Sequence, residues 1–192
     1  MTNGPFPTVG TEQLNSGSWV LDERISETVF TLATVRVEGY TVLYEQPDLR
    51  EQLGEIVEGG DLPWRFFFAT RLTFLPPLAP RIGPMSVFPM VLTESRREFV
   101  ADLRDRGFED VNRGHTQRTR TDSGDRVRLT KYTARFETTE LDARVEAWFG
   151  VWIHNGEFRV AGGAYPVRRI PEMDLTPSNY RDELLSLICN VE

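Results

Sequence analysis

The chain has 192 residues and a formal net charge of −7, with 40% hydrophobic and 11% aromatic residues. This composition excludes a disordered chain and predicts one domain that buries a core without a metal or disulfide. No apolar run reaches the roughly 20 residues that cross a bilayer, and residues 1–10 lack the basic and apolar pattern of a signal peptide. We therefore expect a cytoplasmic protein without a membrane span.

The basic residues are unusual because Lys131 is the only lysine among 22 Lys and Arg residues. Arginine is more weakly hydrated than lysine and pairs bidentately with carboxylates. An acidic, Arg-rich chain with one cysteine, Cys189, resembles cytoplasmic proteins of extremely halophilic archaea. A GC-rich genome would also favour Arg over Lys. The acidic balance argues against general attraction to nucleic acid or anionic lipid.

We predict an extended lead-in over residues 1–18 and a single α+β domain over residues 19–192. Residues 28–37 and 40–44 are rich in β-branched residues, and they predict a hairpin or a bulged pair of strands across Gly39. Apolar residues spaced i, i+4, i+7 and i+8 predict a helix over 48–57. Residues 65–74 place Arg65 and Arg71 on one face of a strand and Phe66, Phe68, Leu72 and Phe74 on the other, which predicts a half-buried strand.

Prolines dominate the segment 75–90. Because proline lacks a backbone donor, this segment predicts a stiff surface loop. A helix is expected over 92–106, with Ser95 and Glu98 as a capping box and Gly107 as the terminal residue.

Four more strands are expected, and tight turns make them antiparallel. They cover residues 115–121, 126–136, 144–154 and 157–165. Asn155-Gly156 is a strong hairpin signal between the last two. A final helix is expected to begin near Thr176-Pro177. The prediction is an α+β fold with one antiparallel sheet of about six to seven strands flanked by three helices.

Four segments of the second half follow a recognisable order of elements: FVADLRDRGFEDV at 99–111, DRVRLTKYTARF at 125–136, VEAWFGVWIHNGEFRVAGGAYP at 145–166 and YRDELLSLI at 180–188. In this order of elements, about half of the chain resembles the photosystem-associated PsbP proteins and the Ran-binding Mog1 proteins. The resemblance implies an α/β/α sandwich with no shared catalytic residues. It also implies a partner-binding or assembly role.

No catalytic motif is visible. His115 and His154 lack a second ligand at metal spacing, and Cys189 lies near a helix C-terminus, where the dipole disfavours a thiolate. Ser86 and Ser123 stand outside any GxSxG motif. We therefore predict no metal site and no cofactor, and the sequence favours a protein that is not an enzyme.

Two regions are candidates for binding. The predicted hairpin 113–135 holds a local basic excess, and its candidate anion ligands are Arg118, Arg120, Arg126 and Arg128. The favoured interpretation is ordinary pairing of these arginines with Asp122, Asp125, Glu137 and nearby acids. The segment 75–90 is either a binding loop or a structural segment that covers one edge or face of the sheet. Its candidate residues are Pro76, Pro77, Arg81 and Phe88.

The leading functional hypothesis is a non-catalytic domain that binds a protein or small-molecule partner or assists assembly. The first alternative is recognition of an anion or nucleic acid by the hairpin 113–135, although steep salt dependence argues against nucleic acid. The second alternative is a small hydrolase with an unrecognised site.

Overall fold

The computed structural model describes residues 5–48, 51, 64–137, 142–167 and 177–192, and these form an α+β fold around one antiparallel sheet. The sheet has seven strands in the order β1-β2-β3-β7-β6-β5-β4. The strands are β1 (Val20–Leu32), β2 (Val35–Glu45), β3 (Phe66–Leu75), β4 (Glu109–Arg120), β5 (Arg126–Glu137), β6 (Asp142–His154) and β7 (Glu157–Pro166). The described helices are α1 (Thr11–Ser16), α3 (Pro84–Asp105) and α4 (Pro177–Cys189). The predicted fold class is confirmed.

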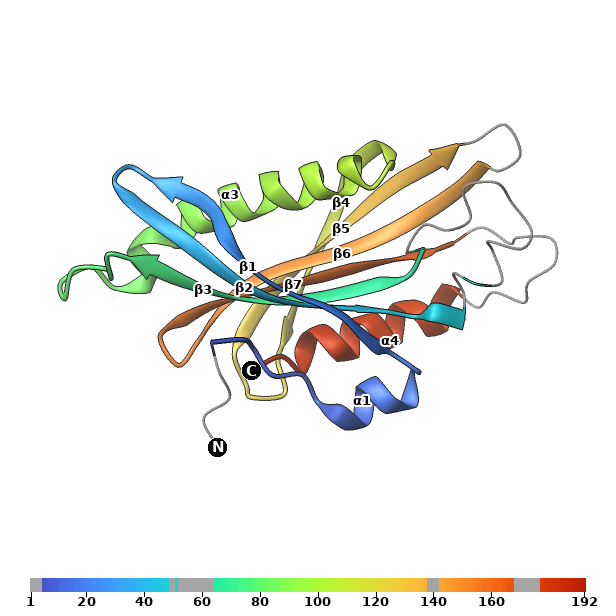
Figure 1. Cartoon of the computed structure of the whole chain (residues 1–192), viewed down its shortest axis with the longest axis horizontal. Coiled ribbons are helices and arrows are strands. Elements are labelled where there is room, and N and C mark those ends of the chain that lie inside the picture. The colour runs from blue at the N-terminus through green and yellow to red at the C-terminus, as the bar shows by residue number, and fades with distance from the viewer. Residues whose placement is uncertain (1–4, 49–50, 52–63, 138–141, 168–176) are drawn as a thin grey trace.

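Helices cover both faces of the sheet, as Figure 1 shows, with α3 on one face and α4 and α1 on the other. The α3 face buries Phe99 and Leu103 of the helix against Phe149 and Val160 of the sheet. The α4 face buries a second cluster around Leu187 and the aromatic residues of the central strands. Two apolar layers therefore hold the sheet, and the central strands β6 and β7 between them are buried on both sides.

The first half of β3 shows this double burial, so the prediction of a half-buried strand was wrong there, whereas Leu72 and Phe74 alternate with the partly exposed Arg71 and Thr73 as predicted. Phe66 and Phe67 point to opposite faces, and both are fully buried. Arg65 precedes the strand and is 3% exposed, because Glu183 of α4 binds its guanidinium at 2.6 Å and Trp19 and Tyr180 contact its faces. Pairing and aromatic contacts let a charged residue occupy a core position.

The first hairpin turns at Ala33-Thr34 rather than at Gly39. Ala33 has a φ of 52°, a left-handed conformation that is uncommon outside glycine. Gly39 lies inside β2 instead, where a Cβ atom would come within 2.4 Å of Val29. The glycine therefore permits close strand packing rather than a turn.

The segment 75–90 is also different from the prediction, because α3 begins at Pro84 and includes Pro89. Pro84 stands in the first turn, where a missing N–H breaks no helical hydrogen bond. Pro89 does remove one such bond, but it lies on the exposed face of the helix. Ser95 is consequently a buried residue in the middle of the helix and not its cap.

The predicted end of this helix is correct. Gly107 has a φ of 90°, and the backbone N–H of Phe108 donates to the carbonyl of Leu103 at 3.1 Å. The lead-in differs from the prediction, because α1 forms within it and Val9 makes a β-bridge with Val191. The helix expected over 48–57 lies largely outside the described residues. None of the described helices is long and apolar enough to span a bilayer.

Candidate functional site

Four arginines lie together at the free end of the β4–β5 hairpin. The strand register places Arg118 opposite Arg128 and Arg120 opposite Arg126. Residues two apart in a strand share a face, so all four side chains project from one side of the sheet. All four are exposed.

That side is the face that α3 covers. Thr130 shares the face with Arg126 and Arg128, and its Oγ1 accepts a hydrogen bond from Nη2 of Arg96 on α3 at 3.3 Å. The first half of α3 and the hairpin enclose a groove of about 730 Å³. We call this groove, with its lining residues, the arginine groove. It is lined by Met85, Phe88, Leu92, Arg118, Thr119, Arg120, Arg126, Val127, Arg128 and Val151.

The arginine groove joins residues from the two candidate regions of the sequence. Phe88, from the proline-rich segment, forms part of its apolar wall and stacks on Phe158 with ring centroids 6.0 Å apart. The other candidates of that segment lie elsewhere. Pro76, Pro77 and Arg81 are exposed in the connection between β3 and α3 and do not line the groove.

The acids expected to neutralise these arginines have other partners. Asp122 accepts a hydrogen bond from Asn190 at 2.8 Å, Asp125 contacts His154 at 2.7 Å, and Glu137 pairs with Arg135 at 3.2 Å. Within the described residues, none of the four groove arginines has a carboxylate partner. Arg120 donates only to the backbone carbonyl of Gly124, at 2.9 Å.

The opposite face of the same hairpin is paired in the ordinary way. Lys131 forms an ion pair with Glu146, and Arg135 contacts Asp110, Glu137 and Asp142 within 3.7 Å. The absence of acid partners is therefore a property of the groove side and not of the whole hairpin.

Further positive charge lies beside the groove. Burial lowers the pKa of Arg96, and the nearby charge of Arg113 lowers it further. The first turn of α3 carries no acidic residue and no side-chain cap, so the positive end of the helix dipole is not neutralised locally. The local field favours an anion.

A family model described as a domain of unknown function, DUF6517, matches residues 6–192. The chain belongs to the DUF6517 family. Comparison with curated proteins gives no match. The family description assigns no activity, so the function of this DUF6517 chain is inferred from its geometry.

The structure also brings together a serine, a histidine and an aspartate that sequence analysis had considered only separately. Ser123 and Asp125 of the β4–β5 turn lie 3.4 and 2.7 Å from Nδ1 of His154. In a hydrolytic triad the serine contacts Nε2 while the aspartate holds Nδ1. Here both contact Nδ1, and Nε2 faces the side-chain amide of Asn155 at 3.0 Å. This cluster links the β4–β5 turn to the β6–β7 turn, and it lacks the geometry of a hydrolytic triad.

Other polar groups of the domain are explained by packing. Tyr165 accepts a hydrogen bond from Trp148 at 3.1 Å and donates to Glu146 at 2.8 Å. Burial raises the pKa of Tyr165, which keeps the phenol protonated as a donor. Among the described residues, no group of three or more His, Cys, Asp or Glu side chains is placed to hold a metal ion.

Proposed function

We propose that this chain is a binding protein whose arginine groove holds a carboxylate-rich peptide segment of a partner protein. The observation that carries this proposal is the group of four exposed arginines that face one another and have no carboxylate partner in the described part of the chain. Like charges directly opposite one another destabilise a sheet. A carboxylate bound between the arginines would relieve this repulsion, which supports a role of the cluster in binding.

The chemistry of the groove suits carboxylates. Guanidinium groups bind carboxylates through two parallel hydrogen bonds, which gives geometric specificity as well as affinity. Four adjacent groups could hold two or more acidic side chains spaced along an extended segment. This arrangement supports a peptide ligand rather than a single small anion.

The apolar wall supports the same choice. Met85 is 72% exposed, and Phe88 and Leu92 lie beside it on α3. These side chains offer contacts for an apolar residue that lies next to the acids in the ligand. Apolar contacts do not weaken in salt, whereas the Debye length falls to about 3 Å at 1 M salt. A groove with both kinds of contact could work in the high-salt setting that we propose for this acidic chain.

The test uses fluorescence anisotropy with a labelled peptide of alternating Glu and Leu. We expect saturable binding to the full chain, and much weaker binding of a Gln-Leu peptide and of a Glu-Ser peptide. Single-stranded DNA and inorganic triphosphate serve as competitors. Tighter binding of DNA would assign the groove to nucleic acid. Equal binding of the Glu-Ser and Glu-Leu peptides would refute the role of the apolar wall.

Variants locate the site. Arg118→Gln and Arg128→Gln each remove a charged hydrogen-bond donor, and we expect each to weaken binding about tenfold or more. Met85→Ser should weaken the Glu-Leu peptide without affecting the fold, because this side chain is mostly exposed. Arg36→Gln is the matched control, since Arg36 is an exposed strand arginine outside the groove. Equal effects of Arg36→Gln and Arg118→Gln would contradict the proposal.

A further inference from the structure

The sheet is open, so its outer strands β1 and β4 each have one edge that pairs with no other strand of the described chain. They are 13 and 12 residues long, whereas most strands have about 5–6 residues. Neither contains a proline, and most of their residues are exposed. β-Bulges interrupt both strands, but residues 23–28 of β1 and 116–120 of β4 pair regularly with their inner neighbours. The free N–H and C=O groups of such edges can pair with a strand of another chain.

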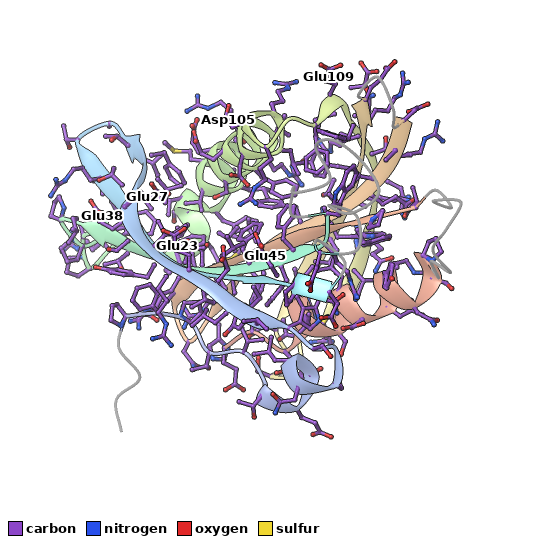
Figure 2. The ribbon with its side chains drawn as sticks, turned by 45° about the vertical axis from the view of Figure 1, so that its right-hand side comes forward. Glu23, Glu27, Glu38, Glu45, Asp105 and Glu109 are labelled. Atoms are coloured by element: carbon purple, nitrogen blue, oxygen red, sulfur yellow. The ribbon has the colours of Figure 1, made fainter. Side chains whose placement is uncertain are left out.

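The free edge of β1 is acidic on the face that α3 covers. Glu23 and Glu27 stand opposite Leu43 and Gly39 of β2, and Leu43 belongs to the apolar cluster of the α3 face. Figure 2 shows both carboxylates on β1, and Ile25 lies between them in the same row. Both glutamates are exposed, and neither forms an ion pair with another residue that the structure describes. We call residues 23–28 the acidic edge.

The free edge of β4 has the opposite charge on the same face. Arg118 and Arg120 project from the regular part of this strand toward the side of α3, and both belong to the arginine groove. The residues that alternate with them, Gln117 and Thr119, are uncharged. We call residues 116–120 the basic edge. The two edges of one sheet are therefore complementary in charge.

The direction of the strands allows the two edges to meet between copies of the chain. Every neighbouring pair in the sheet is antiparallel, and six such pairs separate β1 from β4, so the two outer strands run in the same direction. A second copy that continues the sheet with α3 on the same side therefore sets its β1 parallel to β4. The acids of one copy and the arginines of the other then lie on one face.

Charge favours this head-to-tail arrangement over a symmetric one. In a two-fold dimer that continues the sheet with α3 on the same side, two basic edges would bring arginines together, and two acidic edges would bring glutamates together. Like charges on adjacent strands destabilise a sheet. Head-to-tail pairing instead sets carboxylates beside guanidinium groups, which bind them through charge-assisted hydrogen bonds. Arg24, on the other face of the acidic edge, meets only the uncharged side chains of the basic edge.

We propose that copies of this chain associate head to tail, with the acidic edge of one copy paired with the basic edge of the next. This inference rests on the proposed function, because it names a second copy as the partner that supplies the carboxylate-rich segment. Backbone hydrogen bonds join the two strands, as in other complexes that form by strand addition. Glu23 and Glu27 pair with Arg118 and Arg120. Each added copy leaves one edge of either kind free, so the contact builds chains of copies.

Sedimentation velocity of the full chain over a range of protein concentrations measures this association. We expect oligomers that grow with concentration and that weaken between 0.1 and 1 M salt, as the Debye length falls from about 10 to about 3 Å. The net charge of −7 would have the opposite effect, because salt screens repulsion between like-charged molecules. Association that strengthens with salt would contradict pairing through edge charges. A chain that stays monomeric at every concentration in low salt would overturn the proposal.

Charge reversal identifies the edges. Glu23→Arg combined with Glu27→Arg gives a chain with two basic edges, and Arg118→Glu combined with Arg120→Glu gives a chain with two acidic edges. We expect each double variant alone to associate at least about tenfold more weakly. An equal mixture of the two should recover the association, because each again offers the charge that the other lacks. Misfolding cannot produce this recovery, and a mixture that associates no better than its components would overturn the proposal.

Matched controls and the peptide assay complete the test. Glu12→Arg and Arg36→Glu reverse exposed charges outside both edges and should leave association unchanged. The variant with two basic edges keeps all four groove arginines, so it should bind the labelled Glu-Leu peptide at least as tightly as the unaltered chain does. Peptide binding by a chain that never self-associates would refute only the present proposal. Absence of peptide binding by this variant, whose own edge cannot compete, would refute the proposed function itself.

Discussion

Reversing one charge in the arginine groove should stabilise the fold while it removes the binding site. Arg128 lies directly opposite Arg118 and diagonally across from Arg120. The substitution Arg128→Glu replaces a repulsive cross-strand pair with an attractive one. We expect the free energy of unfolding to rise and the affinity for the Glu-Leu peptide to be lost.

The magnitude follows from the exposure of the four side chains. Cross-strand charge pairs contribute roughly 0.2–1 kcal/mol, and like charges oppose folding by a similar amount. Removing one repulsion and adding one attraction gives about 0.4–2 kcal/mol, and solvent screening of exposed groups reduces this to about 1 kcal/mol. For a chain of this size, about 1 kcal/mol corresponds to a rise in Tm of roughly 2–4 °C.

Urea unfolding at low and at molar salt measures the effect. The gain should shrink in molar salt, because repulsion between exposed charges is then screened. Arg36→Glu is the control, since Arg36 stands opposite the uncharged residues Thr31 and Leu75 and should gain no such stability. A loss of stability in Arg128→Glu, or a gain that does not depend on salt, would refute the electrostatic explanation.

Three further predictions test packing and chemistry. Arg65→Ala should cost about 3–5 kcal/mol in urea unfolding, because it leaves Glu183 without its buried partner; a cost below about 1 kcal/mol would contradict the buried ion pair. Pro89→Ala should raise the free energy of unfolding by about 1–3 kcal/mol, since it restores a helical hydrogen bond at an exposed position; thermal unfolding that stays unchanged or falls would refute this. Burial, and then the charge of Asp122, raise the pKa of Cys189. Alkylation by iodoacetamide at mildly alkaline pH should therefore be slower in the folded chain than in urea, and equal rates would show a freely accessible thiolate.

Turn chemistry explains which strands could be predicted. Asn155 and Gly156 both have positive φ in the structure, as their turn type requires, and the sequence predicts that hairpin correctly. The β1–β2 hairpin was misplaced because Ala33 adopts a positive φ that alanine rarely takes. Nothing in the β-branched run around it marks a break. The pairing of β1 with β2 therefore outweighs the preference of Ala33 for a negative φ.

The proline-rich segment shows the limit of arguing from residue type. Five prolines predicted a loop from 75 to 90, yet only the part before Pro84 lacks helix. The helix extends through Pro89 because burial of the apolar side chains beside it stabilises the helix by more than the one lost hydrogen bond costs. Phe88 stacks on Phe158, and Val91 is completely buried. Burial of large apolar side chains contributes about 1.5–3 kcal/mol each, which offsets the lost bond.

The four arginines could be selected from the sequence, but the lack of carboxylate partners for them among the described residues could not be predicted. The register is centred on Ser123, so residues equally distant from it face one another. A register shifted by one residue would have paired the same arginines with different neighbours. The apolar wall was still less predictable, because it depends on how α3 crosses the sheet. That crossing brings Phe88 beside residues some thirty positions away in the chain.

Net charge is a weak guide to a single site because it averages over surfaces of opposite sign. The value of −7 argues against general attraction to nucleic acid or anionic lipid, yet the first half of α3 lies beside a group of arginines that have no carboxylate partner among the described residues. The second half of the same helix lies beside Glu27 of the acidic edge. At 0.1 M salt, exposed charges interact over only about 10 Å, so a ligand responds to the groups at its own site and not to the total. The sign of the local field, set by strand register and by the path of α3, therefore decides which ligand each site can hold.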